Sequence, residues 1–114
     1  MKRGEVWTIG GGKDYASKPR PAVIVQDDRF DSTDSLTVCA FTTDPTVAPL
    51  FRLPVRPSDR NGLRTPCSLM VDKITTVPKT KLGRRIGVLA DSEMADLNRA
   101  LLVFLGIAAP QRKQ

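Results

Sequence analysis

Two short motifs in the sequence carry side chains that suit one kind of chemistry. Arg20 lies between two prolines directly before an apolar run, and Thr42 and Thr43 end the next apolar run. An arginine guanidinium is a permanent cation whose planar fork matches phosphate oxygens, and a threonine hydroxyl donates a hydrogen bond. If the two runs are antiparallel neighbours, both motifs lie at the same rim of a sheet. The sequence therefore predicts a cation and a hydroxyl donor side by side. Taken singly, the arginine reads as a surface charge and the threonines as ordinary strand residues.

Other candidate sites are better explained as structure. The run Gly10-Gly11-Gly12-Lys13 lacks the spacing of a phosphate-binding loop and reads as a hairpin tip. The aspartates of residues 27–34 do not fit a calcium loop, and Cys39 lies inside an apolar run as a small core residue. The chain has no histidine, which excludes a Ser-His-Asp triad, a Cys-His pair and histidine-based RNA hydrolysis. We therefore expect neither a metal ion nor a cofactor.

Short apolar runs separated by turn residues define the elements. A helix is predicted over residues 92–106, where Met94, Leu97 and Leu101 recur at helical spacing, Asp91 or Ser92 caps the start and Gly106 marks the stop. The remaining runs predict a single domain over residues 1–114, mostly β (α+β), as a compact SH3-like antiparallel barrel that the helix closes. Strands are expected at Glu5–Ile9, Ala22–Gln26, Leu36–Phe41, Phe51–Val55, Ser68–Thr76 and Arg85–Leu89.

The charge of the chain is concentrated in one segment. The net charge is +6, and the whole excess lies in residues 60–90, where the only acidic residue is Asp72. Such a stretch attracts phosphate backbones, although a solvated cationic face is the plainer interpretation. No apolar run is long enough to span a membrane and no signal peptide is recognisable, so we expect no membrane partner and a cytoplasmic protein with reduced thiols.

Several of these motifs together resemble the MazF/PemK toxins. The resemblance rests on Arg3-Gly4-Glu5-Val6-Trp7, Arg20-Pro21-Ala22-Val23-Ile24-Val25, Val38-Cys39-Ala40-Phe41-Thr42-Thr43, Asp72-Lys73-Ile74, Leu82-Gly83 and the amphipathic segment 92–106. These motifs follow the family's order over nearly the whole chain. The resemblance implies an SH3-like barrel, a homodimer, metal-free cleavage of single-stranded RNA through its 2′-hydroxyl, and restraint by a cognate MazE-like antitoxin.

Carried over to this sequence, the resemblance places the catalytic arginine at Arg20 and the catalytic threonine at Thr42. Many relatives carry Gly-Ser-Glu where this chain has residues 13–17, and Gln or another polar residue where Asp44-Pro45 follows the threonines. Both differences fall where RNA bases would be read, so they bear on the cleavage sequence more than on the reaction. We expect supporting or RNA-binding roles for Thr43, Lys18, Lys13, Asp44 and Lys73.

The chemistry of these side chains fits that implied reaction. Attack of a 2′-hydroxyl on phosphorus requires removal of its proton, protonation of the leaving 5′-oxygen and positive charge beside the developing phosphorane. Arg20 supplies the charge, so its expected role is electrostatic. Thr42 would hydrogen-bond the scissile phosphate or orient the 2′-hydroxyl, and no covalent intermediate is needed.

Readings from other classes remain open on the sequence. One alternative is a non-enzymatic toxin of the same fold, similar to the CcdB group that poisons a DNA topoisomerase. The resemblance to that group implies a Trp-Gly-Ile C-terminus, whereas this chain ends in Gln111-Arg112-Lys113-Gln114. A plain RNA-binding module explains the basic stretch, but one Trp, one Tyr and four Phe leave few aromatic platforms for stacking bases. No cofactor motif supports a metabolic enzyme.

Overall fold

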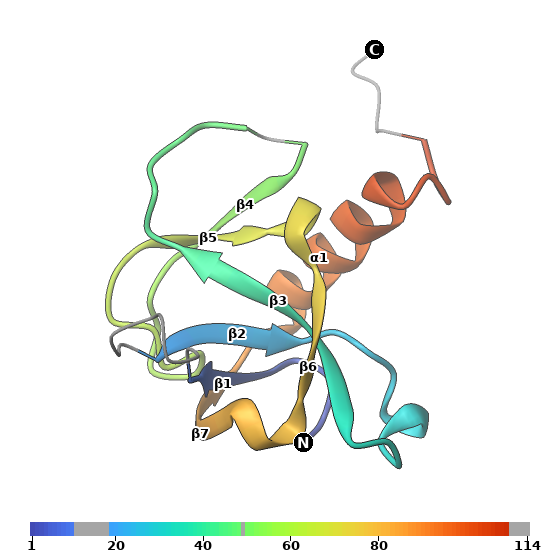
Figure 1. The fold of residues 1–114 in the computed structure, drawn as a ribbon. Helices are drawn as coiled ribbons and strands as arrows, with labels where there is room; N and C mark the ends of the chain where they lie inside the picture. Colours follow the sequence, from blue (N-terminus) through green and yellow to red (C-terminus); the bar gives the residue numbers. More distant parts are fainter. Residues whose placement is uncertain (11–18, 49, 110–114) are drawn as a thin grey trace.

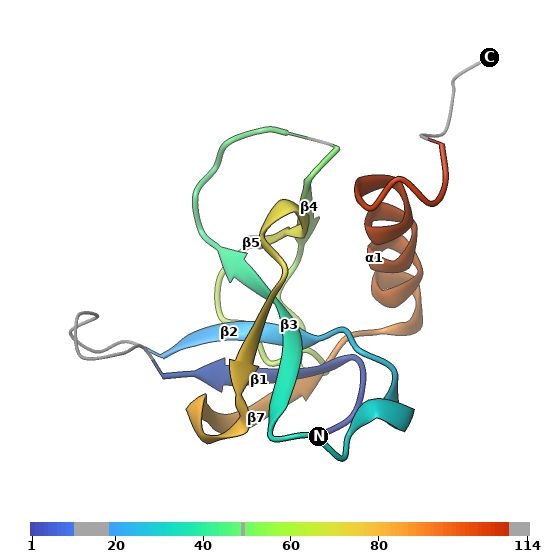
Figure 2. The ribbon, with the colours of Figure 1, turned by 45° about the vertical axis from the view of Figure 1, so that its right-hand side comes forward.

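The fold is an antiparallel sheet that curves around the core, with one helix along its side (Figures 1 and 2). The computed structural model describes residues 1–10, 19–48 and 50–109. Hydrogen-bonded neighbours follow the order β4-β5-β3-β2-β1-β7, and β6 pairs with β3 as well. The elements are β1 (Glu5–Ile9), β2 (Arg20–Ile24), η1 (Asp28–Phe30), β3 (Ser35–Thr42), β4 (Arg52–Val55), β5 (Cys67–Met70), η2 (Val71–Lys73), β6 (Thr75–Pro78), η3 (Lys79–Lys81), β7 (Leu82–Val88) and α1 (Asp91–Phe104).

The mostly β fold with a C-terminal helix is confirmed, but the sheet does not close into a barrel by strand pairing. In the described part of the chain, β4 and β7 are the two ends of the strand order and do not pair with each other. The loop of residues 56–66 fills the gap between them, and the amide of Val88 in β7 donates to the carbonyl of Arg60 in this loop at 2.9 Å. The rim between β4 and β7 is therefore built by a loop rather than by a strand ladder.

One predicted strand is divided in the structure. The run Ser68–Thr76 forms β5 and β6, which both pair with β3 along the same edge, with η2 between them. Phe41 and Thr42 pair with β5, whereas Ser35–Val38 pair with β6. The single turn at η2 buries Val71 completely, so the chain leaves the ladder to fill the core at this point.

Two apolar clusters lie on opposite faces of the central strands. One cluster packs under α1 and contains Val23, Cys39 and Leu97; the other contains Ile24 and Val38 and lies under β6. Alternating residues of β2 and β3 are thus buried on both sides, as the near-continuous apolar runs predicted. These two strands form the rigid centre that carries the predicted site at their ends.

The boundaries of α1 agree with the sequence, but its first turn is closed differently. The residue before the helix is Ala90, whose backbone amide donates to Oε1 of Glu93 at 2.8 Å, so neither Asp91 nor Ser92 caps the start. At the other end Gly106 adopts a φ of 76°, as expected for a glycine that stops a helix.

Candidate functional site

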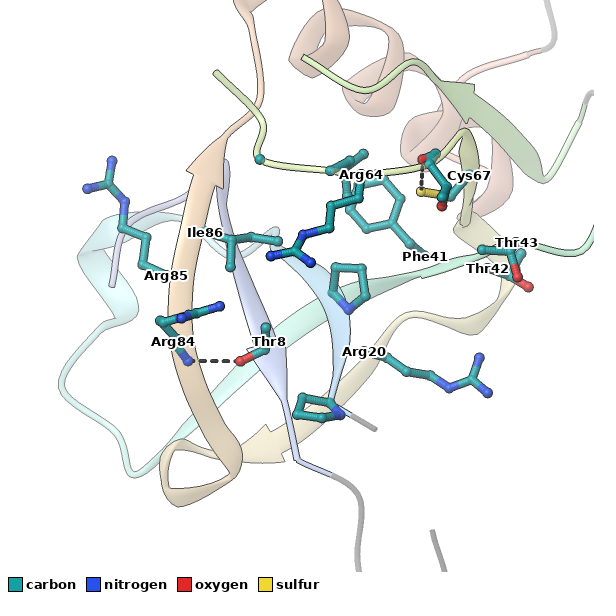
Figure 3. A pocket seen from close by; sticks show the side chains of 15 residues that line it. Thr8, Arg20, Phe41, Thr42, Thr43, Arg64, Cys67, Arg84, Arg85 and Ile86 are labelled. Carbon is teal, nitrogen blue, oxygen red and sulfur yellow. Dashed lines mark hydrogen bonds between the residues drawn. The ribbon is translucent and has the colours of Figure 1, made fainter. Parts of the chain in front are cut away.

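A groove of about 790 Å³ lies beside the sheet. Strands β1, β2, β3, β5 and β7 contribute lining residues, as do residues 62–65 of the loop of residues 56–66. Among the described lining residues, four are arginines and none is acidic: Arg20, Arg64, Arg84 and Arg85. In Figure 3, Arg20 and the threonines lie toward one end, Arg84 and Arg85 toward the other, and Arg64 projects between them. The groove is thus a cationic surface, of the kind that attracts anions.

Arg20 and Thr42 both line the groove. Strands β2 and β3 pair antiparallel, with Ala22 opposite Ala40. The same register, extended two residues toward the rim, would set Arg20 opposite Thr42, and directly opposite residues of an antiparallel pair direct their side chains to the same face. The direct juxtaposition of the two side chains remains a prediction.

The Thr42 hydroxyl is oriented by the backbone that follows it. Its Oγ1 atom accepts a hydrogen bond from the amide of Asp44 at 3.2 Å. Because this bond occupies a lone pair, the hydroxyl proton remains available to donate to a ligand. The Asp44 carboxylate turns away toward Thr46, accepting from its hydroxyl at 2.7 Å and its amide at 2.9 Å. These two hydrogen bonds lower the pKa of Asp44, so the group stays ionised near the rim.

The four groove arginines are not equally free to bind a ligand. Arg85 forms an ion pair with Glu5 at 3.4 Å, and its side chain points away from the other arginines in Figure 3. In residues 1–10, 19–48 and 50–109, no ion pair engages Arg20, Arg64 or Arg84. No acidic side chain of these ranges therefore competes with a ligand for the three guanidinium groups.

The remaining predicted residues are placed at varying distances from this site. Thr43 lines the groove beside Thr42, whereas neither Asp44 nor Lys73 is a lining residue. Lys13 and Lys18 lie outside the described residues, as does most of the glycine run before them. The roles expected of these residues remain predictions.

The basic stretch of residues 60–90 divides between the groove and other surfaces. Arg64, Arg84 and Arg85 line the groove. Arg60 instead approaches Asp91 at 3.8 Å, and Lys79 forms an ion pair with Asp31 at 3.2 Å. The charge excess indicated a cationic surface, but the sequence did not distinguish Arg64 and Arg84 from their neighbours. Thr8, which also lines the groove, gave no sequence signal.

The two cysteines differ in their surroundings. Cys39 is completely buried, and this burial raises the pKa of its thiol to about 12, with the Asp72 carboxylate adding to the shift. Cys39 is a core residue, as expected. Its thiol stays protonated near neutral pH, so it is not a nucleophile. Cys67 lines the groove, and its thiol, which donates to the carbonyl of Thr65 at 3.2 Å, also has a pKa raised by burial.

Two features that would bear on function, a cluster of metal-binding side chains and a membrane-spanning helix, are absent from the described residues. No group of three or more His, Cys, Asp or Glu side chains within the described ranges is placed to hold a metal ion. No helix in the same ranges is long and apolar enough to cross a membrane.

Comparison with known proteins gives one consistent result. Residues 2–105 match the family of PemK-like, MazF-like toxins of type II toxin-antitoxin systems. The chain is 53% identical over 108 residues to a probable endoribonuclease MazF of Mycolicibacterium smegmatis, covering 95% of this chain and 99% of that protein. It is 30% identical to endoribonuclease MazF9 of Mycobacterium tuberculosis, over 94% of this chain and 98% of that protein.

The fold has a close counterpart among solved structures. A mycobacterial endoribonuclease in complex with its cognate antitoxin superposes with a TM-score of 0.77 at 27% identity, covering 96% of this chain and 99% of that one. Sequence and fold agree, and the chain belongs to the PemK-like, MazF-like toxin family of type II toxin-antitoxin systems.

Proposed function

We propose that this chain is the toxin of a type II toxin-antitoxin system and acts as an endoribonuclease on single-stranded RNA, with mRNA as the first candidate target. The observation that supports the reaction is that Arg20 and Thr42 line one groove together with three further arginines. A polyanionic strand fits a groove with that charge, and a hydroxyl beside a guanidinium fits the charge that develops on its phosphate. The family membership and the endoribonuclease relatives support the same activity.

The proposed reaction is an intramolecular transesterification at phosphorus. The ribose 2′-oxygen forms a bond to the adjacent phosphorus, the bond to the 5′-oxygen of the next nucleotide breaks, and a proton passes from the first oxygen to the second. The products are a 2′,3′-cyclic phosphate, which water can open to a 3′-phosphate, and a 5′-hydroxyl end. Atoms and charge balance without a metal ion, a cofactor or a covalent enzyme intermediate.

Arg20 and Thr42 have distinct roles in this step. The Arg20 fork is exposed and free of carboxylate partners in the described part of the chain, so it can pair with the non-bridging oxygens as negative charge accumulates on them. Thr42 donates a hydrogen bond from its hydroxyl to the same phosphate, or orients the 2′-hydroxyl. The Asp44 amide, which donates to Thr42 Oγ1, holds the hydroxyl in place for either role. Thr43 supports the adjacent backbone at the rim.

Two protein partners follow from the same proposal. A MazE-like antitoxin would neutralise the chain, as one mycobacterial relative is found with its cognate antitoxin. A second copy of the chain would extend the groove as a homodimer, and the exposed Leu102, Phe104 and Leu105 at the end of α1 are candidates for that contact. The proposed action on RNA supports a cytoplasmic location.

Chemically modified RNA tests the reaction directly. A single-stranded RNA is incubated with the protein in excess EDTA, and the fragment ends are identified by mass spectrometry. We expect cuts at a short recurring sequence that leave 2′,3′-cyclic or 3′-phosphates, and no cut where a 2′-deoxy nucleotide precedes the bond. Cleavage that needs added Mg²⁺, or that proceeds at the 2′-deoxy position, would contradict the mechanism.

A further inference from the structure

A second cationic position lies in the groove apart from Arg20 and Thr42. Arg64 comes from the loop of residues 56–66 and projects into the middle of the groove, and Arg84 comes from β7, at the side away from Thr42 and Thr43 in Figure 3. No carboxylate of the described residues forms an ion pair with either guanidinium. Two arginines left unneutralised on one lining surface suit a second backbone phosphate of a bound strand.

The backbone on either side of this position is fixed by side-chain hydrogen bonds. The amide of Arg84 donates to Oγ1 of Thr8 on the neighbouring strand at 2.9 Å. The loop before Arg64 is organised around Asn61, which is completely buried. Its Oδ1 accepts from the amides of Ser58 at 2.9 Å and Leu63 at 3.0 Å. Arg64 therefore follows a loop whose course is set by one side chain.

Asn61 also ties this loop to α1. Its Nδ2 donates to the carbonyl of Arg56 at 2.8 Å and to Oε2 of Glu93 at 3.2 Å. Leu63, which comes directly before Arg64, is buried in the cluster under α1. A buried amide with every hydrogen bond made within its own loop and the adjacent helix holds the loop in one conformation.

We infer that Arg64 and Arg84 form a substrate subsite that binds an RNA backbone phosphate other than the scissile one, and that Asn61 is the positioning residue that holds Arg64 there. The inference rests on the proposed function and deepens it, because it separates holding the strand from cutting it. Arg20 and Thr42 act on the reacting phosphate, whereas Arg64 and Arg84 set which bond of the strand lies beside them.

The first test separates strand binding from the chemical step. Steady-state cleavage of one RNA substrate is measured for Arg64→Ala, Arg84→Ala and the control Arg56→Ala, which removes an exposed arginine of the same loop outside the groove. We expect KM to rise about tenfold for each groove variant, the loss of one charge-assisted contact, with kcat little changed. The slope of log KM against log salt should fall by about 0.7 for each groove arginine removed and stay constant for the control.

A double-mutant cycle tests the role of Asn61. If Asn61 acts through Arg64, Asn61→Ala raises KM about threefold in the wild-type background and has no effect on KM in the Arg64→Ala background. A purely structural role would give equal effects in both. Because Asn61→Ala orphans buried amides, Glu93→Gln serves as a second, milder variant that disturbs the same hydrogen bond, and folding is checked by circular dichroism.

Binding measurements keep this test distinct from the test of the reaction. Affinity is measured with an RNA carrying a 2′-deoxy nucleotide at the cut site. If the wild type binds unmodified RNA without cutting it, the proposed reaction fails, and weaker binding of the 2′-deoxy RNA by the two groove variants still supports the subsite. If the groove variants match Arg56→Ala in affinity, KM and salt slope, or lose kcat alone, the subsite is overturned.

Discussion

Ala22 of β2 lies opposite Ala40 of β3, and two residues further toward the rim are Arg20, the first residue of β2, and Thr42, the last residue of β3. The exposed arginine and the oriented threonine hydroxyl thus end two strands whose centres are buried on both faces. A rigid platform of this kind can hold both groups toward one phosphate without reorganisation during the reaction.

The Thr42 hydroxyl is expected to act in the chemical step. Thr42→Val removes the hydroxyl while keeping the shape of the side chain, so kcat should fall about 10²- to 10³-fold with little change in stability. Thr43→Val is the matched control and should cost less than about tenfold, because Thr43 has no facing arginine. Single-turnover RNA cleavage measures both. Equal losses for the two variants would remove the distinction between them.

The fork of Arg20, and not its charge alone, is expected to matter. Arg20→Lys keeps the cation but loses the two parallel donors, so the rate should fall at least about tenfold while remaining above that of Arg20→Ala. The same single-turnover assay ranks the three proteins. A lysine variant as active as the wild type would reduce Arg20 to a point charge.

Glu5 makes the stability of the fold sensitive to acid. Burial alone would raise the pKa of its carboxyl, but hydrogen bonds from the Lys2 amide and the Trp7 indole, the N-terminal ammonium and Arg85 together lower the pKa below its usual value. A lowered folded-state pKa stabilises the protein above the unfolded pKa, and this contribution is lost as pH falls through the folded value.

Glu5→Gln should therefore destabilise the protein by about 1 kcal/mol near neutral pH. The difference from the wild type should shrink toward zero as the pH falls through the lowered folded-state pKa, because the wild-type carboxyl then becomes protonated as well. Urea unfolding at a series of pH values measures the difference. A constant difference at every pH would show that the charge of Glu5 is not involved.

Gly62 is expected to be indispensable to the loop that carries Arg64. Its φ is 73°, and a Cβ atom there would fall on the carbonyl group of Ile86 in β7. Gly106 has nearly the same φ of 76° but open space around it, so it provides a control for backbone strain alone. Gly106→Ala should cost about 1 kcal/mol of unfolding free energy, and Gly62→Ala clearly more. Equal losses of unfolding free energy for the two variants would mean that β7 shifts away from the new Cβ atom at no energetic cost.

The sequence predicted those parts of the molecule that depend on local patterns. The alternation and apolar runs around Val23 and Cys39 marked two central strands, and their antiparallel pairing is confirmed. Arg20 and Thr42, at the ends of these strands, both line the groove. Spacing alone also located α1, although the hydrogen bond of Glu93 to the Ala90 amide moved its first turn by one residue.

Features that depend on tertiary contacts were not predictable in this way. The burial of Val71 breaks the ladder between β5 and β6, and nothing in an apolar run signals such a break. Asn61 lies in a polar loop and reads as a turn residue, yet it is buried because the loop fills the opening between β4 and β7. Arg64 and Arg84 likewise differ from most other basic residues of the stretch by lining the groove, which depends on tertiary contacts that the sequence pattern does not show.

The central claim is that Arg20 makes this groove a ribonuclease that needs no metal ion. The most direct measurement incubates the wild type and Arg20→Ala with a long single-stranded RNA in excess EDTA and maps the fragment ends. The account predicts discrete cuts at a recurring sequence by the wild type alone, with both proteins equally folded. Cuts by the Arg20→Ala variant at the wild-type rate would contradict the assignment, and no cuts by either folded protein across several RNAs would indicate a toxin that binds its target without cutting it.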